Sequence, residues 1–355
     1  MKKLLYVLCA VFAIAGCDRE QSNKPVIKIG MLYPLSGNAA VFGDTAKMTA
    51  KMFFQDNPNI KYKYELVWED SQANPATAVS AVRKLINYDH VDIVLDMYSS
   101  VGLAVSPITN EVKIPHLTFA QDRNISNGFY NYRVVTSAKK TGEKTYDALK
   151  YRNLKNITAV VENTPGTLSL YDGFKNIAKK DKDMKITEIM VNPGERDFNV
   201  ILNKINKKTS DIVLTVLQSP EIDVFMRQAK TNNVSVPITG LQSFTMLKDK
   251  SLADGMWYVD VTMATKDFLD KYNKISKNAP TNFAENFYTQ LVVAVTNFES
   301  FDTKPTAEEF INNLSVVNGV MSPLGKLVYD KDEQNIDTNA SVRLVKDGAV
   351  IEIKE

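Results

Sequence analysis

The chain contains little cysteine and little histidine, with two residues of each kind among its 355. A disulfide framework, or a zinc site built from these two residue types, is therefore not expected. The sequence also lacks the HExxH, GxSxG and Walker-type motifs, which would indicate a metalloprotease, a serine hydrolase or a nucleotide-binding P-loop. We therefore expect a protein without enzymatic activity, without a metal and without a cofactor.

The chain has almost no excess of either charge. Its 43 Lys and Arg residues against 41 Asp and Glu residues give a net charge of +2 at pH 7, whereas nucleic-acid binders usually carry a basic excess or a basic stripe. The 44% hydrophobic and 24% charged residues match an ordinary globular protein and exclude a disordered chain. We therefore expect a globular protein that does not bind nucleic acid.

Long hydrophobic runs are also missing, and the longest uninterrupted one extends from Leu4 to Ala15. About twelve apolar residues are too few to cross a hydrocarbon core of ~30 Å. Placed directly after Lys2 and Lys3, such a run is typical of a secretion signal. The sequence therefore predicts that the protein is exported from the cytoplasm.

A cleavage signal follows this run, because Ile14-Ala15-Gly16-Cys17 resembles the lipobox at which bacterial lipoproteins are lipidated on cysteine and cleaved before it. We predict a signal peptide over residues 1–16 and a lipid anchor on Cys17. The alternative is an ordinary signal peptide that happens to end near a cysteine.

Residues 17–25 are polar and patternless, which is typical of a flexible tether. Asp18 resembles the inner-membrane retention signal of Gram-negative lipoproteins. We therefore expect the protein to be anchored at the periplasmic face of the bacterial inner membrane, or at the cell surface if the source is Gram-positive. Loss of Lys2 and Lys3 with the signal peptide leaves 41 of the 43 basic residues, equal to the 41 acidic ones.

From Val26 onward, strand-like apolar runs alternate with segments of helical periodicity. This βαβα order predicts an α/β fold in which helices cover both faces of a parallel sheet. The runs that carry the pattern are Val26–Leu32, Tyr64–Trp68 and Val91–Leu95 for strands, and Asp44–Phe54 and Pro75–Ile86 for helices. A later helical segment extends from Asn282 to Phe298, and strand-like residues follow at Lys326–Tyr329 and Ser341–Val345.

Two short motifs occur twice in the same order. Asp92-Ile93-Val94-Leu95 recurs as Asp211-Ile212-Val213-Leu214, and Ile114-Pro115 recurs as Val236-Pro237. The offsets of 119 and 122 residues are nearly equal, which indicates two similar α/β lobes. Open parallel sheets bind ligands at the carboxyl ends of their strands, so the matched loop positions Ser99, Gln218, Ala120 and Gln242 are expected to line one cleft between the lobes.

Further motifs resemble a known family. They are Ile27-Lys28-Ile29-Gly30, Pro34-Leu35-Ser36-Gly37, Phe42-Gly43, Trp68 to Pro75, Ser99-Ser100, Ile114-Pro115, Asp197-Phe198, Gly240 and Gly319 to Gly325. As an ordered set they resemble the branched-chain amino-acid (Leu/Ile/Val) binding proteins of ABC transporters, which have the type I periplasmic-binding fold. The resemblance extends over essentially the whole mature chain.

This resemblance implies two Rossmann-like lobes with parallel sheets, joined by a three-crossover hinge that lets them close on a ligand. The crossovers would fall near Val134–Ala138, Trp257–Thr262 and Gly319–Gly325. The N-terminal lobe would then comprise residues 26–136 plus 262–318, and the C-terminal lobe residues 137–261 plus 319–355.

The resemblance also implies which residues contact the ligand. In the family, the residue matching Ser99 holds the ligand carboxylate, whereas the alternative for this serine is simple helix capping. The backbone carbonyl at Ala120 would accept from the ligand ammonium. An aromatic residue at Phe42 would wall the pocket, or pack in the core instead. The full set of predicted contacts is Phe42, Tyr98, Ser99, Ser100, Ala120, Gln121, Asp122, Gln218 and Gln242.

Two of these positions depart from the family. Amino-acid binders usually have a hydroxyl residue where this chain has Asp122, and an acid where it has Gln242. Near a ligand carboxylate, Asp122 would be repelled by about 4 kcal/mol at 4 Å and an effective dielectric of 20. Either Arg123 pairs with Asp122 and turns it out of the site, or the ligand is an amine or amide rather than an ordinary amino acid.

The function predicted from the sequence is that of an extracytoplasmic solute-binding lipoprotein of an ABC importer. It would capture an amino acid, a small amide or an amine by closure of its lobes and deliver it to the permease subunits. The alternative is a ligand-sensing receptor of the same fold that signals to a protein partner, because one fold can host several functions.

Overall fold

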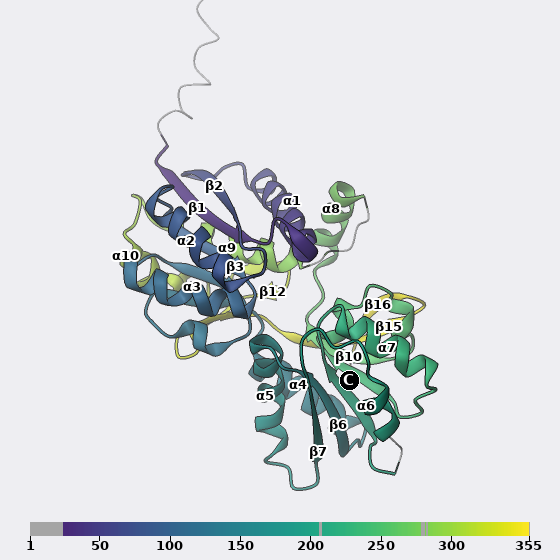
Figure 1. Ribbon diagram of the computed structural model, residues 1–355. Coiled ribbons are helices and arrows are strands. Elements are labelled where there is room, and N and C mark those ends of the chain that lie inside the picture. The colour runs from purple at the N-terminus through teal and green to yellow at the C-terminus, as the bar shows by residue number, and fades with distance from the viewer. Residues whose placement is uncertain (1–23, 206–207, 278–280, 282, 355) are drawn as a thin grey trace, which may run out of the picture.

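The protein is described by a computed structural model that covers residues 24–205, 208–277, 281 and 283–354. The predicted signal peptide, Cys17 and the tether as far as residue 23 lie outside the described residues. The described chain forms two α/β lobes, each built on a seven-stranded sheet (Figure 1). None of its helices combines the length and the apolar character needed to cross a bilayer.

The sheet of the first lobe has the strand order β13-β14-β5-β4-β3-β1-β2. Its neighbouring strands are parallel except for the antiparallel edge pair β13–β14. The strands are β1 (Val26–Tyr33), β2 (Lys63–Asp70), β3 (Ile93–Met97), β4 (His116–Phe119), β5 (Asn131–Val134), β13 (Val328–Asp330) and β14 (Asn335–Asp337).

The second sheet repeats this arrangement, with the order β16-β15-β10-β9-β8-β6-β7. The five strands β7, β6, β8, β9 and β10 run parallel, while β15 pairs antiparallel with both β10 and β16. The strands are β6 (Asn156–Glu162), β7 (Lys185–Val191), β8 (Ile212–Val216), β9 (Ile238–Leu241), β10 (Trp257–Val261), β15 (Ala340–Lys346) and β16 (Ala349–Ile353).

Helices cover both faces of each sheet, which leaves the central strands fully buried. In the first lobe, α1 and α9 pack on one face and α2 and α3 on the other. In the second lobe, α6 and α7 cover one face and α4 and α5 the other. The helices are α1 (Ala40–Asp56), α2 (Pro75–Asn87), α3 (Ser99–Val112), α4 (Ala138–Tyr151), α5 (Pro165–Ala178), α6 (Asn199–Lys204), α7 (Glu221–Thr231), α8 (Lys266–Ser276), α9 (Ala284–Glu299) and α10 (Ala307–Asn312).

The two repeated motifs occupy equivalent places in the two lobes. The Asp92 carboxylate accepts from the backbone N–H of Lys28 at 2.8 Å at the start of β1, and the Asp211 carboxylate accepts from Asn156 N–H at 2.8 Å at the start of β6. The repeated prolines also match. The Pro115 carbonyl accepts from the Val94 N–H in the first lobe, and the Pro237 carbonyl accepts from the Val213 N–H in the second. The internal repeat therefore reflects a real duplication of structure, as the sequence predicted.

The chain crosses between the lobes three times, after β5, after β10 and after β14. The expected third crossing at 319–325 is wrong. Asn335 and Ile336 pair with Arg133 and Val134 of β5, and Ile336 is buried in the core of the first lobe. Residues 319–337 therefore belong to the first lobe rather than to the second, and the crossing lies at residues 338–339.

The residues expected at this crossing form a short hairpin instead. Its strands are β11 (Met321–Ser322) and β12 (Gly325–Lys326). Glycine at 325 has a φ of +91°, a left-handed conformation that favours glycine and that suits a tight turn. The Gly319–Gly325 segment is thus a turn within the first lobe, and its composition does not tell which lobe receives the strands that follow.

In the second lobe, α4 and α5 approach closely because both carry glycine at the contact. A Cβ atom on Gly173 would lie 2.1 Å from the carbonyl oxygen of Ala138, and one on Gly142 would lie 2.4 Å from the backbone of Gly173. Neither helix can accept a larger residue there without moving. The contact fixes how α5, whose N-terminus reaches the cleft, sits on its lobe.

We expect Gly173→Ala to lower the free energy of unfolding by about 1–3 kcal/mol, because the added methyl group overpacks a backbone contact. Asp172→Ala changes the exposed neighbour on the same helix and should stay within about 0.5 kcal/mol of the parent. Urea unfolding followed by far-UV circular dichroism measures both. Equal stabilities of the two variants would contradict this account of the α4–α5 contact.

Candidate functional site

Two cavities lie between the lobes, where the carboxyl ends of strands from both sheets converge. The smaller has a volume of about 380 Å³ and the larger about 820 Å³. Tyr98, Gln218, Met246 and Phe283 line both of them, so the two cavities adjoin each other. Each is walled by both lobes, and a molecule bound there would contact both.

The N-terminus of α3 faces the smaller cavity. The chain leaves β3 and turns at Tyr98, which has a φ of +77°, so the helix starts immediately at Ser99. No side chain caps this end of the helix, and Tyr98, Ser99 and Ser100 all line the cavity. The N–H groups of a first helical turn and the positive end of the helix dipole favour a bound anion.

Ser99 also organises the loop that follows β4. Its Oγ accepts from the backbone N–H groups of Gln121 and Asp122, both at 3.2 Å, and its own hydroxyl hydrogen remains to be donated. Ser99 is therefore more than a helix cap, because it joins the α3 terminus to the Ala120–Asp122 loop. Ala120 and Gln121 both line the smaller cavity.

Gln121 is buried, at 9% exposure, and only half of its side-chain amide has a partner. Its Nε2 donates to the Thr136 carbonyl at 3.2 Å, whereas its Oε1 is buried without a hydrogen-bond partner among the described residues. An unpaired buried acceptor costs about 1–3 kcal/mol. A ligand N–H or O–H that reached this oxygen would remove that cost.

Asp122 is placed differently from the expectation. It lines neither cavity, and its Oδ1 instead accepts from the Asn124 N–H at 2.8 Å, capping the short helix Arg123–Ser126. The Arg123 guanidinium pairs with Glu333 at 3.0 Å rather than with Asp122. The alternative in which Arg123 pairs with Asp122 is therefore wrong, and the contact between Asp122 and the ligand stays a prediction.

The second lobe contributes two amide side chains to the smaller cavity. Gln218 follows β8 and Gln242 follows β9, and both line the cavity together with Ser99 and Ala120. The structure thus brings together the four loop positions that the internal repeat had matched. Because Asp122 lies outside, all the described side chains that line the smaller cavity are uncharged, and its polar groups are hydroxyls, amides and backbone.

Aromatic residues lie where the two cavities adjoin. Phe42 on α1 lines the larger cavity rather than the smaller one, and its ring stacks on Phe283 with centroids 5.7 Å apart. It also forms a T-shaped contact with the Tyr98 ring, with centroids 6.0 Å apart. Phe283 was not predicted as a site residue, because its apolar neighbours at helical spacing indicated core packing.

The lobes are in contact beside the smaller cavity. The Ser169 hydroxyl on α5 donates to the Gln121 carbonyl at 3.0 Å, and the space above Gly166 is filled by the Ser99 Oγ, which would lie 3.2 Å from an added Cβ. The N-termini of α3 and α5 therefore approach each other across the cleft. A small residue at 166 leaves room for this approach.

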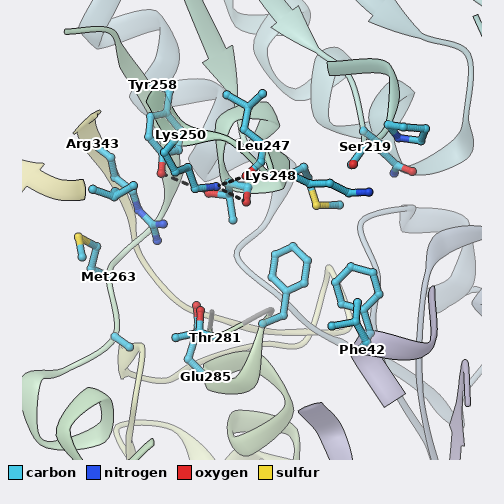
Figure 2. Close-up of a pocket in the computed structure, with 18 of the residues that line it drawn as sticks. Phe42, Ser219, Leu247, Lys248, Lys250, Tyr258, Met263, Thr281, Glu285 and Arg343 are labelled. Carbon is cyan, nitrogen blue, oxygen red and sulfur yellow. Dashed lines mark hydrogen bonds between the residues drawn. The ribbon is translucent and has the colours of Figure 1, made fainter. Parts of the chain in front are cut away.

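The larger cavity holds charged residues that the sequence did not single out. Its charged lining residues are Lys248, Lys250, Glu285 and Arg343 (Figure 2). They come from the loop after β9, the start of α9 and strand β15, so no local motif connects them. Lys250 donates to the carbonyls of Phe244, Thr245 and Leu247 at 2.7–2.9 Å, and burial lowers its pKa to about 8.

The chain matches the model of a family described as periplasmic binding protein over residues 26–349. A Leu/Ile/Val-binding protein, BraC3 of Rhizobium johnstonii, is 24% identical over 93% of both chains. The fold is similar to that of the leucine binding protein LivK of Thermotoga maritima, with a TM-score of 0.82, 18% identity and coverage of 92% of this chain and 98% of that one.

A second similar structure has a different kind of ligand. It is the solute-binding protein of an ABC transporter from Rhodopseudomonas palustris in complex with 3,4-dihydroxybenzoic acid, with a TM-score of 0.80, 19% identity and coverage of 92% of this chain and 96% of that one. These likenesses confirm the predicted two-lobed type I periplasmic-binding fold. The match to a family of binding proteins also confirms the prediction that the chain is not an enzyme.

The lowered pKa of Lys250 predicts how the free energy of unfolding depends on pH. An unfolded lysine has a pKa of about 10.4, so between about pH 8 and pH 10 the unfolded chain binds a proton that folded Lys250 has released. The free energy of unfolding then rises with pH in this window. Lys250→Met lacks this contribution, so the stability of the parent minus that of the variant should increase from about pH 7.5 to pH 9.5.

Urea unfolding of the parent and of Lys250→Met at matched pH values measures this difference. Comparing the two proteins cancels the titration of the other lysines and of the tyrosines, which they share. A difference in stability that stays constant over the window would contradict a lowered pKa at Lys250.

Proposed function

The chain belongs to the periplasmic binding protein family, and on that premise we propose that it is the extracytoplasmic solute-binding component of an ABC importer. It performs no chemistry. It captures a small ligand between its lobes, and the closed form delivers the ligand to the permease subunits in the membrane.

The observation that carries this proposal is the smaller cavity, which is built from loops at the carboxyl ends of strands in both lobes. A ligand bound there contacts the α3 terminus on one side and the amides of Gln218 and Gln242 on the other. Such a ligand gains contacts only when the lobes approach, so it prefers the closed form. Differential affinity of this kind is what a ligand needs to shift a conformational equilibrium.

We propose that the ligand places a carboxylate at the α3 N-terminus, where Ser99 and Ser100 supply hydroxyl donors in addition to backbone N–H groups. An N–H of the ligand would reach the unpaired Oε1 of Gln121 or the carbonyl of Ala120. Because the lining of this cavity is uncharged, the ligand's nitrogen is held by neutral acceptors rather than by an acidic side chain. Both amino acids and small amides meet these requirements.

The wall residues complete the proposed ligand site. Tyr98 lies where the two cavities adjoin, and Phe42 supports it by the T-shaped ring contact. Phe42 therefore acts from the larger cavity, as a boundary of the site rather than as part of its smaller chamber. Asp122 is left out of the proposed ligand contacts.

The location of the protein follows from its first residues. We propose that Cys17 carries the lipid and that residues 18–25 act as the tether, so that the lobes stay near the permease. A protein with no net charge after removal of the signal peptide has little long-range electrostatic attraction for its ligand, and a membrane anchor keeps it close to the transporter instead.

Ser99→Ala should weaken ligand binding by about ten- to 150-fold, because a hydrogen bond to a charged group contributes about 1.5–3 kcal/mol. Native mass spectrometry of the purified protein identifies a co-purified ligand, and isothermal titration then measures its affinity for parent and variant. Ser80→Ala, on the exposed face of α2, is the matched control and should bind as the parent does.

Reconstitution of the liganded protein with the transporter in vesicles decides between an importer and a receptor. Addition of liganded protein to vesicles that carry the permease and ATPase encoded beside it should stimulate ATP hydrolysis. No stimulation, together with ligand-dependent binding to a kinase or transcriptional regulator, would overturn the importer in favour of a sensor. No small-molecule ligand at all would overturn both.

Cys17→Ala should release the protein from membranes, because the lipid is attached through that sulfur. Fractionation of cells that express parent and variant measures the membrane-bound share, and Cys9→Ala is the matched control because residue 9 lies in the predicted signal peptide. Retention of the Cys17→Ala protein in the membrane fraction would contradict the predicted anchor.

A further inference from the structure

The larger cavity concentrates positive charge on one side. Lys248, Lys250 and Arg343 all belong to the second lobe, and they line a space whose opposite wall is formed by the first lobe (Figure 2). Glu285 is the one acidic residue among the described residues that line it. The lining therefore carries three cationic groups against one carboxyl, in a protein that is neutral as a whole.

Arg343 is the most buried of these cations, at 6% exposure. One of its terminal nitrogens donates to the Val261 carbonyl, and the other lies 3.5 Å from the Asp260 carboxylate. Its Nε is buried and has no hydrogen-bond partner among the described residues. An unpaired donor on a buried guanidinium is costly, and a carboxylate is the group whose geometry suits the guanidinium fork.

The two lysines differ in what they can offer to a ligand. The three donors of Lys250 are directed to three backbone carbonyls (Figure 2), so this lysine supplies charge but leaves no free hydrogen. Lys248 is exposed, and only its backbone N–H has a described contact, with Asp223 at 2.9 Å. Its ammonium can move to meet an anion in the cavity, where Tyr258 supplies a hydroxyl group as well, whereas the Thr245 hydroxyl is donated to the Asp260 carboxylate.

Glu285 faces Arg343 from the start of α9, on the other lobe (Figure 2). It is buried, at 8% exposure, and its Oε2 has no partner among the described residues. Burial raises the pKa of this carboxyl, and the charge of Arg343 acts in the opposite direction. Burial thus disfavours the negative charge of Glu285, while the nearby Arg343 favours it.

We propose that Arg343, Lys250 and Lys248 form an anion subsite for a second acidic group of the ligand, so that the ligand carries a carboxylate at both ends. One end lies at the α3 N-terminus in the smaller cavity, and the other lies against Arg343 in the larger one. The residues shared by the two cavities, Tyr98 and Phe283 among them, flank the middle of such a ligand. This inference rests on the proposed function and narrows its ligand class.

The direct test compares linear dicarboxylates from succinate to suberate with their mono-amides, which keep the length and lose one charge. Isothermal titration to the full-length mature protein measures each affinity. The dicarboxylate of matching length should bind at least about tenfold more tightly than its mono-amide, a factor that corresponds to about 1.4 kcal/mol. Equal binding of the two members of every pair would overturn the proposal.

Three variants locate the subsite. Arg343→Lys retains the charge that pairs with Asp260 but removes the Nε donor, and it should weaken the dicarboxylate about tenfold while leaving the mono-amide within about twofold. Lys248→Gln should weaken the dicarboxylate about threefold, more so at low salt. Lys180→Gln, an exposed lysine of the same lobe outside both cavities, is the matched control and should change neither affinity.

Lys248→Gln also keeps the proposal testable if Arg343→Lys does not fold, which circular dichroism would reveal. Glu285→Gln removes the carboxyl opposite the guanidinium and should strengthen dicarboxylate binding. If Glu285 only closed the lobes by pairing with Arg343, this change would instead weaken dicarboxylate and mono-amide alike, and that outcome would overturn the subsite.

The same titrations separate this inference from the function on which it rests. Tight binding of a neutral amino acid that is unaffected by Arg343→Lys and Lys248→Gln would overturn the anion subsite and leave a solute-binding protein. Failure of all the probes, together with absence of any co-purified ligand in native mass spectrometry, would overturn both.

Discussion

The structure depends on the place where the chain passes between its two lobes, because there the three crossings are hydrogen-bonded to one another. The Ser137 N–H donates to the Asp337 carboxylate at 3.0 Å, the hydroxyls of Thr136 and Thr338 are paired, and the Thr262 N–H donates to the Asn339 carbonyl at 2.7 Å. These contacts hold the two sheets so that the carboxyl ends of their strands meet at one cleft. A hinge of three linked segments lets the lobes close while it restricts sliding.

The two lobes contribute different chemistry to that cleft. The first lobe supplies an uncapped helix N-terminus, the loop held by Ser99 and an aromatic wall of Phe42, Tyr98 and Phe283. The second supplies neutral amides to the smaller cavity and cations to the larger one. The uncharged and the cationic parts of the lining thus lie one after the other along the cleft, and Glu285 of the first lobe faces the cations of the second. Contacts at the two ends of the ligand would orient it, so its binding does not depend on a net charge of the protein.

Much of the fold could be predicted from the sequence, because each lobe is a repeat of strands and helices whose apolar spacing is local. The paired motifs at Asp92 and Asp211 located equivalent strands, and from them Ser99 and Gln218 followed as loop positions at one cleft. What the sequence did not show was the partner that a charged side chain or a strand finds in the fold. Asp122 is drawn into a local cap, Arg123 finds Glu333 two hundred residues later, and strand β14 joins the sheet of the first lobe by pairing with β5.

The sequence by itself therefore determined the class of fold, its duplication and the loops that reach the cleft, because hydrophobic periodicity and short motifs report on neighbours along the chain. Only the tertiary structure decided which charges face the ligand space. Lys250, Glu285 and Arg343 come from three separate segments and look like ordinary polar residues in the sequence. They become a cluster because β15 lies beside β10, and α9 starts on the opposite lobe.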